Sequence, residues 1–368
     1  MPDHVLTLRE LNRATLARQM LLEREANSVP DAIERLIGMQ AQVPRPPYVG
    51  LWTRLRDFRR EDLSRLVERR LVVRGTLMRS TLHLTTARDY AFLRPTLQPA
   101  LTRALYSVAG KRLDSLDIEK LVTAARVYFE EEPRTFAELR LWLAGIEPNR
   151  DPSALAYAVR TSLPLLQIPS GGQWGYPGNA LFTTAESWLG HPLPDSANPR
   201  ELVRRYLAAF GPATIMDVQQ WSGLNRLRDV VEGMRSELRL YRNEAGKELF
   251  DLPDTPLSPV DTPAPARFLP EFDNLLLSHA DRSRIISDEY RKRIFTKNGL
   301  IPGTILIDGF MRGVWRIEKT TSMATLVIEP FGKLSKQDRD SLSEEGKRLV
   351  RSIEDGAKAH SIRFEMVG

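Results

Sequence analysis

The sequence predicts an α+β protein in which tandem winged-helix (helix-turn-helix) units precede a small β-rich, barrel-like C-terminal domain. Three observations support this prediction. One segment with Pro, Thr, an acidic residue and Trp at matching positions occurs twice. Each copy lies among amphipathic helical patterns that end in a hairpin-like run. A proline-rich stretch then separates the copies from apolar segments typical of strands.

The repeated segment reads PRTFAELRLWLAG at 133–145 and PATIMDVQQWSGL at 212–224. Thr followed three residues later by Glu or Asp is a helix-capping pattern, so both segments are expected to begin a helix. Trp142 and Trp221 fall on the face that a core would bury, and we expect them to be core residues rather than platforms for base stacking.

The surroundings of the two copies define two units, residues 113–190 and 197–252. Each has a helical pattern before and after the repeated segment. Each closes with a hairpin-like run, with a Gly171-Gly172 turn in one and an Ala245-Gly246 turn in the other. Three helices followed by a two-stranded hairpin is the winged-helix form of helix-turn-helix.

Residues 1–112 fit the same plan more loosely. Helices are expected at 8–22, 29–41 and 60–70, and two strands around a short turn at 71–86. A helical pattern at 87–105 leads into the next unit. The connection between the second and third helices is lengthened by VPRPPYVGLW at 43–52, where the prolines are expected to prevent helix continuation.

Residues 251–267 are proline-rich and are predicted to be a linker. The β-rich domain is expected to span 264–368. Its predicted strands lie within 266–279, 303–320 and 323–332, followed by a closing helix at 343–359.

Composition excludes several classes of protein. Of the 368 residues, 42% are hydrophobic and 27% charged, as in a globular protein, and no apolar run approaches the ~18 residues of a membrane span. There is no cysteine, and the five histidines are scattered, so we expect no disulfide, metal or cofactor. We expect a cytoplasmic protein without a membrane partner. The formal charge of +6 favours a polyanionic partner.

Between residues 54 and 79 nine arginines face four acidic residues, a local excess of nine minus four, or +5. One interpretation is a solvated helix face, and the other is a nucleic-acid surface. Tandem winged helices with such a stripe indicate double-stranded DNA, bound either by a helix in the major groove or by several units that cradle the duplex.

Gln40 and Gln42 stand two residues apart before Pro44. Residues i and i+2 share a face only where the chain is extended, and the residue before a proline favours extended geometry. A convergent pair of carboxamides would hold one water molecule or grip a sugar–phosphate. When only their spacing is considered, the alternative is that the two glutamines are ordinary loop residues without a function.

Several segments resemble the AlkZ-like (YcaQ-related) winged-helix DNA glycosylases. LIGMQAQVPRPPYVGLWTRL at 36–55 resembles the catalytic Q-x-Q loop of that family. LMRSTLHL at 77–84 resembles its L-M-R-G-T-L-H-L segment, with Ser80 where Gly is usual. RFLPEFDNLLLSHADR at 267–282 and GTILIDGFMRGVWRIE at 303–318 resemble its C-terminal signatures. The likeness covers nearly the whole chain in the same order.

The resemblance implies excision of N7-alkylated purines, including unhooking of interstrand crosslinks left by alkylating natural products, with Gln40 and Gln42 as catalytic residues. Carboxamides orient a water through C=O and N–H groups but are poor proton acceptors. They suffice when the base is a cationic, labile leaving group. No lysine stands out as a Schiff-base nucleophile, so a monofunctional enzyme is predicted.

A set of side chains near the glutamines and in the C-terminal domain is predicted to contact DNA: Arg45, Arg54, Arg74, Arg79, Thr81, His83 and Arg312. For Arg79 a surface salt bridge is the alternative, and for His83 a hydrogen-bonded structural role. The DGFMRG segment at 308–313 is either a plain hairpin turn or a probe that enters the minor groove with Phe310 or Met311 as wedge.

A crosslinked base stays tied to the opposite strand and cannot be flipped freely into a deep pocket, so an open basic cradle is the expected form of the site. Two rival hypotheses are a non-catalytic winged-helix transcription regulator and a protein that sequesters the free alkylating compound. We expect a monomer, because the tandem units already supply internal repetition.

Overall fold

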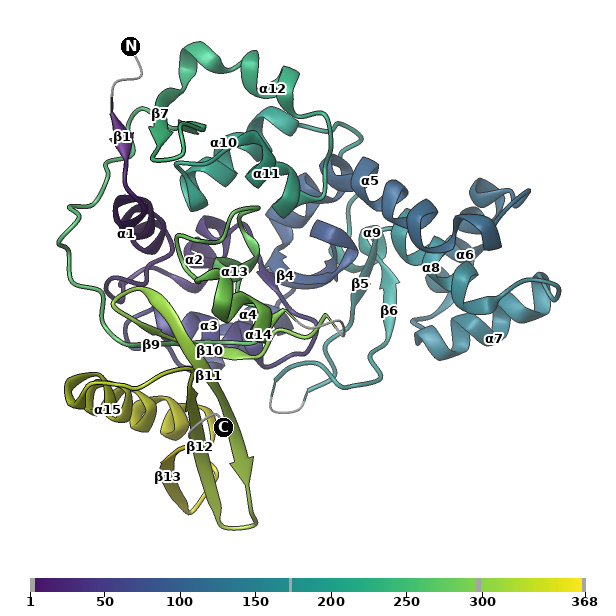
Figure 1. Ribbon diagram of the computed structural model, residues 1–368. Coiled ribbons are helices and arrows are strands. Elements are labelled where there is room, and N and C mark those ends of the chain that lie inside the picture. Colours follow the sequence, from purple (N-terminus) through teal and green to yellow (C-terminus); the bar gives the residue numbers. More distant parts are fainter. Residues whose placement is uncertain (1–3, 172–173, 296–298, 366–368) are drawn as a thin grey trace.

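The computed structural model describes residues 4–171, 174–295 and 299–365 (Figure 1). It is a mixed α+β structure, as predicted, and the described residues form three sheets. Within these ranges no helix is long and apolar enough to cross a membrane. The same residues contain no cluster of three or more His, Cys, Asp or Glu side chains that would hold a metal ion.

The N-terminal unit contains the three predicted helices and the predicted strand pair. Its elements are β1 (Val5–Leu6), α1 (Leu8–Arg18), α2 (Val29–Arg35), β2 (Met39–Gln40), α3 (Pro46–Arg54), α4 (Arg60–Glu68), β3 (Val72–Thr76), the 3₁₀ turn η1 (Met78–Ser80) and β4 (Leu82–Thr86). The proline-rich stretch was wrongly expected to be only a loop. Pro46 and Pro47 occupy the first turn of α3, where a missing N–H costs nothing and the fixed φ suits a helix.

The long helix α5 (Ala87–Ala109) and the 3₁₀ turn η2 (Gly110–Arg112) lead into two further helical units. The second unit contains α6 (Ile118–Glu131), α7 (Phe136–Ile146), α8 (Pro152–Ser162), β5 (Leu165–Gln167), β6 (Phe182–Thr184) and α9 (Ala185–Leu189). The third contains α10 (Pro199–Phe210), α11 (Ile215–Ser222), α12 (Arg228–Glu232), the 3₁₀ turn η3 (Arg235–Glu237), β7 (Arg239–Asn243) and β8 (Glu248–Asp251). The strands of each unit pair in antiparallel fashion.

Both predicted capping patterns are present. Thr135 and Thr214 cap α7 and α11, each by a reciprocal capping box with the acidic residue three positions on. Trp221 is fully buried, as predicted. Trp142 is only half-buried and stacks on Tyr128 with ring centroids 4.4 Å apart. The predicted Ala245-Gly246 turn connects β7 to β8, whereas Gly172 of the predicted Gly-Gly turn lies outside the described residues.

The strands of the first and second units do not form separate wings. They join in one five-stranded sheet in the order β2-β4-β3-β5-β6, through a pairing of Gly75 with Leu166. A Cβ at Gly75 would lie 2.6 Å from a ring carbon of Tyr90, so only glycine allows β5 and α5 to approach β3 this closely. The shared sheet therefore connects the Q-x-Q strand rigidly to the second unit.

The C-terminal domain is an open sheet in the order β13-β12-β11-β10-β9, so the predicted barrel-like form is wrong. Its strands are β9 (Arg267–Leu269), β10 (Gly303–Ile307), β11 (Phe310–Lys319), β12 (Met323–Pro330) and β13 (Ala359–Phe364), and its helices are α13 (Asn274–Leu277), α14 (Asp288–Ile294) and α15 (Lys336–Ile353). Helix α15 covers the sheet through Leu342, Leu349 and Val350 and removes the need for closure. In Figure 1 helix α15 and strands β11, β12 and β13 form the lower end of the molecule, while α13 and α14 lie near its middle.

The DGFMRG segment is a plain hairpin turn that packs against α1. Asp308 pairs with Arg9 and Arg13, and a Cβ at Gly309 would lie 2.5 Å from Leu16. Met311 is buried in the core. Met311 therefore cannot act as a minor-groove wedge, because the protein already covers it, whereas Phe310 is only half-buried and its entry into the groove stays a prediction.

Candidate active site

The helix expected at 29–41 ends at Arg35, so Gln40 lies on the short strand β2, and Gln42 lies in the bend that follows it. Gly38, with φ of +84°, ends the turn after α2, and β2 then pairs Gln40 with His83 of β4. The amide of Ala41 continues the ladder by donating to the carbonyl of Leu82 at 2.8 Å. We call residues 39–47 the carboxamide loop.

Each carboxamide is held through its oxygen. Oε1 of Gln40 accepts from Nη2 of Arg79 at 2.8 Å, and Oε1 of Gln42 accepts from the amide of Leu82 at 2.8 Å. Gln40 is buried and Gln42 is exposed. Because both partners can only donate, the oxygen positions are unambiguous, and each NH₂ group together with a second oxygen lone pair is left to meet water or substrate.

Arg74 of β3 holds the backbone of the carboxamide loop. It is buried, and it donates to the carbonyls of Ala41 at 2.8 Å and Gln42 at 3.1 Å. Burial lowers its pKa to about 10. Arg74 was predicted to contact DNA, and the structure corrects this, because its donors are directed into the protein.

Arg79 connects the carboxamide loop to the third unit. Its Nη1 donates to the carbonyl of Trp221 at 2.5 Å and its Nη2 to Gln40. Burial and the charge of Arg282 lower its pKa to about 10. No carboxylate pairs with it among the described residues, so the alternative of a surface salt bridge is wrong. Its two bonds instead fix the carboxamide of Gln40.

His83 and Thr81 were predicted to contact DNA but use their polar groups internally. His83 is fully buried, its Nδ1 lies 3.0 Å from the carbonyl of Thr81, and burial lowers its pKa to about 3. It is therefore a neutral structural residue, as the alternative interpretation held. The hydroxyl of Thr81, which is half-buried, donates to the carbonyl of Met78 at 3.1 Å.

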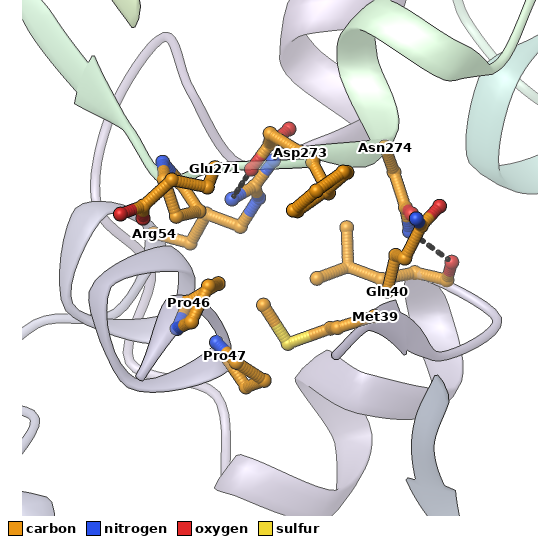
Figure 2. A pocket seen from close by; sticks show the side chains of 11 residues that line it. Met39, Gln40, Pro46, Pro47, Arg54, Glu271, Asp273 and Asn274 are labelled. Carbon is orange, nitrogen blue, oxygen red and sulfur yellow. Dashed lines mark hydrogen bonds and ion pairs between the residues drawn. The ribbon is translucent and has the colours of Figure 1, made fainter. Parts of the chain in front are cut away.

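A small cavity separates the carboxamide loop from residues 270–274 of the C-terminal domain (Figure 2). Figure 2 shows Gln40 and Asn274 on one side of the cavity and Glu271 and Pro46 on the other. Nδ2 of Asn274 donates to the carbonyl of Gly38 at 2.6 Å. These contacts join residues more than 200 positions apart, so no local sequence pattern could show them. Only the family resemblance of residues 267–282 indicated that this segment is important.

Arg54 lines the same cavity and is also corrected from a DNA contact to a structural residue. Only 1% of it is exposed, and its guanidinium forms a bidentate pair with Asp273 at 2.8 and 2.9 Å. Arg45 is partly exposed and pairs with Glu271 at the mouth of the cavity. Arg54 thus ties α3 to the C-terminal domain, and Arg45 keeps one face toward solvent.

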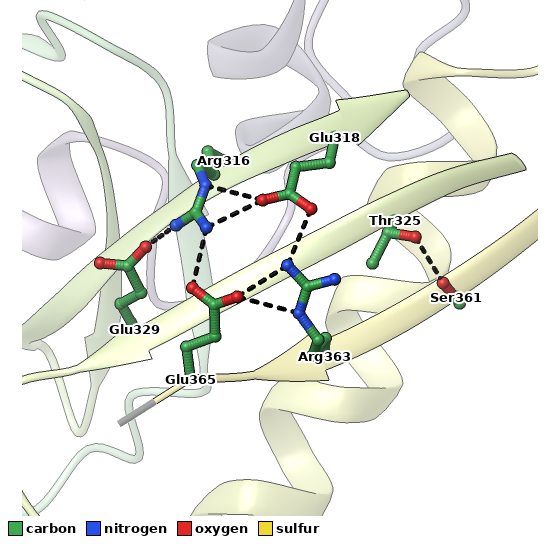
Figure 3. A network of polar contacts seen from close by, with 7 residues as sticks. All are labelled: Arg316, Glu318, Thr325, Glu329, Ser361, Arg363 and Glu365. Atoms are coloured by element: carbon green, nitrogen blue, oxygen red, sulfur yellow. Dashed lines mark hydrogen bonds and ion pairs between the residues drawn. The ribbon is translucent and has the colours of Figure 1, made fainter. Parts of the chain in front are cut away.

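Arg312 is exposed on β11 and has no carboxylate partner among the described residues. Other cations of this sheet are neutralised. Figure 3 shows Arg316 and Arg363 in a network with three glutamates, Glu318, Glu329 and Glu365. Of the predicted DNA contacts, Arg45 and Arg312 therefore still present their charge at the surface.

The arrangement is a pair of carboxamides at the edge of a sheet within a multi-helical scaffold, one held by Arg79 and the other by the amide of Leu82. The family model of the AlkZ-like DNA glycosylases matches residues 33–352, a span that contains this whole arrangement. The chain belongs to the AlkZ-like DNA glycosylase family, and it is a DNA glycosylase.

Two comparisons with proteins of Streptomyces sahachiroi, one of sequence and one of structure, support this conclusion. The chain is 27% identical to the interstrand DNA cross-link repair glycosylase of that organism over 371 aligned residues, which cover 92% of this chain and 94% of the relative. The solved structure of the DNA glycosylase AlkZ from the same organism superposes with a TM-score of 0.79 at 23% identity. That superposition covers 98% of this chain and all of the other, and it shows the same fold.

Proposed function

We propose that this enzyme hydrolyses the N-glycosidic bond of N7-alkylated purines, including bulky adducts and interstrand crosslinks from alkylating natural products, in base-excision repair or self-resistance. The observation that carries the proposal is the pair of carboxamides fixed through oxygen, Gln40 by Arg79 and Gln42 by the amide of Leu82. The interstrand DNA cross-link repair glycosylase of Streptomyces sahachiroi, similar over nearly its whole length, supports the choice of substrate.

The chemistry follows from what a carboxamide can do. It positions a water by donating and accepting hydrogen bonds but takes up a proton poorly. N7-alkylation makes the purine cationic, so the bond between C1′ and N9 breaks without protonation of the leaving group. Gln40 and Gln42 then need only place the water beside C1′ and orient it toward the oxocarbenium-like sugar.

We propose that the third unit binds the duplex as a winged helix, that the first two units bind it through their helices, and that the open surface around the carboxamide loop accommodates a base still tied to the opposite strand. The exposed arginines Arg45 and Arg312 and those around α4 would meet phosphates. A single chain supplies every element of this site, so we propose a monomer acting on the bacterial chromosome in the cytoplasm.

The test uses duplexes with one N7-methylguanine or one N7 crosslink, and it scores alkali-labile abasic sites. We expect Gln40→Ala and Gln42→Ala to slow base release by about 100-fold or more. Gln337→Ala, an exposed glutamine at the start of α15, is the matched control and should release the base at the wild-type rate. Tight sequence-specific binding to undamaged DNA without any release by the wild type would overturn the proposal. The strand should stay intact until alkali is added.

A further inference from the structure

A second cavity of about 350 Å³ opens beside the carboxamide loop, between β4 and the second unit. Helices α7 and α8 and strands β5 and β6 form its walls. Its lining combines aromatic rings, two guanidinium groups and a carboxamide: Phe136, Arg140, Tyr157, Arg160, Gln167 and Phe182. The volume falls in the range usual for small-molecule sites.

Two hydrogen-bonded connections run from the lining of the cavity to the residues around the two glutamines. Leu82 lines it, and the amide of Leu82 holds Oε1 of Gln42 at 2.8 Å. Ser80 accepts from the hydroxyl of Tyr157 at 3.2 Å, and its carbonyl accepts from Arg160 at 3.4 Å. A group bound in the cavity would therefore lie against Leu82, the residue whose amide holds the carboxamide of Gln42.

Gln167 gives the cavity a polar group that the protein leaves unsatisfied. Only 7% of this residue is exposed, and its Oε1 is buried without a hydrogen-bond partner among the described residues. Nε of Arg160 is likewise buried without a hydrogen-bond partner in the part of the chain that the structure describes. A buried carboxamide oxygen without a donor is costly, and such groups in native proteins commonly wait for a ligand.

The lining suits a planar heteroaromatic ring. Phe136 and Phe182 meet edge to face at 4.5 Å, and the guanidinium of Arg160 lies 4.9 Å from the centroid of Tyr157. Aromatic faces accept a ring by stacking, while guanidinium and carboxamide groups pair with the acceptors and donors on a base edge. Arg140 is exposed, so the cavity is open on one side and admits a base that remains tethered.

We propose that this cavity is the purine subsite of the enzyme and receives the damaged base as its bond to the sugar breaks. This assignment rests on the proposed function. When the C1′–N9 bond breaks, its electron pair moves into the purine and neutralises the positive ring. Water adds to C1′ and releases a proton. Two guanidinium groups repel the cationic base and accept the neutral one, so they favour departure.

Binding of free N7-methylguanine base tests this assignment by saturation-transfer NMR, independently of excision. We expect the base to bind the wild type and Gln42→Ala alike and to inhibit excision competitively. Gln167→Leu and Arg140→Ala should weaken binding by about 5- to 10-fold, as for loss of one hydrogen bond. Arg126→Ala, on α6 and paired with Glu130 and Glu186, removes an arginine away from the cavity and should bind as the wild type.

Equal binding of the base by wild type, Gln167→Leu and Arg140→Ala would overturn the purine subsite. So would variants that slow only a bulky adduct and excise N7-methylguanine at the wild-type rate, because the cavity would then hold the substituent. A wild type that binds the free base but releases none from DNA would refute the excision proposal and leave this subsite standing. Arg140 is exposed, so its variant is expected to fold even where Gln167→Leu does not.

Discussion

The arginine-rich segment between residues 54 and 79 divides into two regions that use the same side chain in opposite ways. Around α4 the arginines point to solvent: Arg56, Arg59, Arg65, Arg69 and Arg70. In β3 and η1, Arg74 and Arg79 are turned inward and hold the carboxamide loop. A segment rich in arginine therefore contains side chains of two kinds. Some are exposed and available to phosphate, and others are turned inward and hold the carboxamide loop. The two regions should respond differently to substitution.

The largest effect is expected at Arg79. Arg79→Met removes the donor that fixes Gln40, and loss of this orientation should slow single-turnover excision at saturating enzyme by about 10- to 100-fold. Stability should fall by about 1 to 2 kcal/mol, because the carbonyl of Trp221 and Oε1 of Gln40 each lose their donor. The comparison of excision rate with thermal midpoint separates the two effects.

Arg69→Met is the matched control for Arg79→Met, since Arg69 is exposed in the other region. At saturating enzyme it should excise at the wild-type rate. If Arg79→Met retained that rate too, the inward arginines would be structural only and the division between the regions would lose its functional meaning.

The next effect is expected on α4. Arg65 and Arg69 line a groove of about 350 Å³ with Arg56 and two aspartates. Replacing Arg65 and Arg69 together by Ala should weaken duplex binding by about 10-fold near physiological salt and reduce the salt slope by about 2, one for each phosphate contact. Fluorescence anisotropy over a salt series measures both. Single-turnover excision at saturating enzyme should be unchanged, in contrast with Arg79→Met.

Loss of the same charge elsewhere provides the control for α4. Lys336 and Lys347 are exposed on α15, and replacing both by Ala removes two positive charges as well. An equal fall in affinity in that variant would show a general effect of net charge, and the α4 region would then be an ordinary solvated face.

A smaller effect concerns His83 in the inward region. Its pKa of about 3 in the folded protein lies below its ordinary value of 6.5, so only the unfolded chain takes up a proton between these values. The contribution is complete above pH 6.5 and is lost as the pH falls toward 3. His83→Gln should thus remove about 1 kcal/mol of the destabilisation seen between pH 7.5 and 5.5 in urea titrations. His191→Gln, at an exposed histidine, should leave the wild-type slope.

The parts of the fold that could be predicted are those that local sequence patterns determine. The capping boxes at Thr135 and Thr214 and the helices of each unit follow from spacings of a few residues. Helix α3 was missed because prolines at 46 and 47 break a helix interior yet suit its first turn.

The parts that could not be predicted depend on contacts between distant segments. The inward-facing arginines are held by Asp273 for Arg54, by the carbonyl of Trp221 for Arg79 and by the backbone of the carboxamide loop for Arg74. No local sequence pattern predicts these partners. Likewise, β3 can pair with β5 because Gly75 has no side chain that would keep the two strands apart. The sequence predicted Gln40 and Gln42 as candidate catalytic residues, whereas the side chains that hold them could be identified only in the structure.

The smallest effect is expected at Ser80, which joins the inward region to the purine subsite. Ser80 adopts φ of +58°, a left-handed conformation that glycine reaches freely and other residues at a cost of about 1 kcal/mol. The family segment that LMRSTLHL resembles has Gly at this position. The serine hydroxyl accepts from Tyr157 at 3.2 Å, which offsets part of this cost.

Replacing Ser80 by Gly or by Ala separates conformation from hydrogen bonding, because both variants lose the hydroxyl and only Ala keeps the Cβ. We expect Ser80→Gly to be more stable than Ser80→Ala by up to about 1 kcal/mol in urea titrations, less whatever flexibility glycine adds to the unfolded chain. The wild type should lie between them or close to Ser80→Gly. An alanine variant as stable as the glycine variant would mean that η1 carries no strain. The inward region would then owe the placement of Arg79 to its hydrogen bonds alone and not to the backbone of the turn.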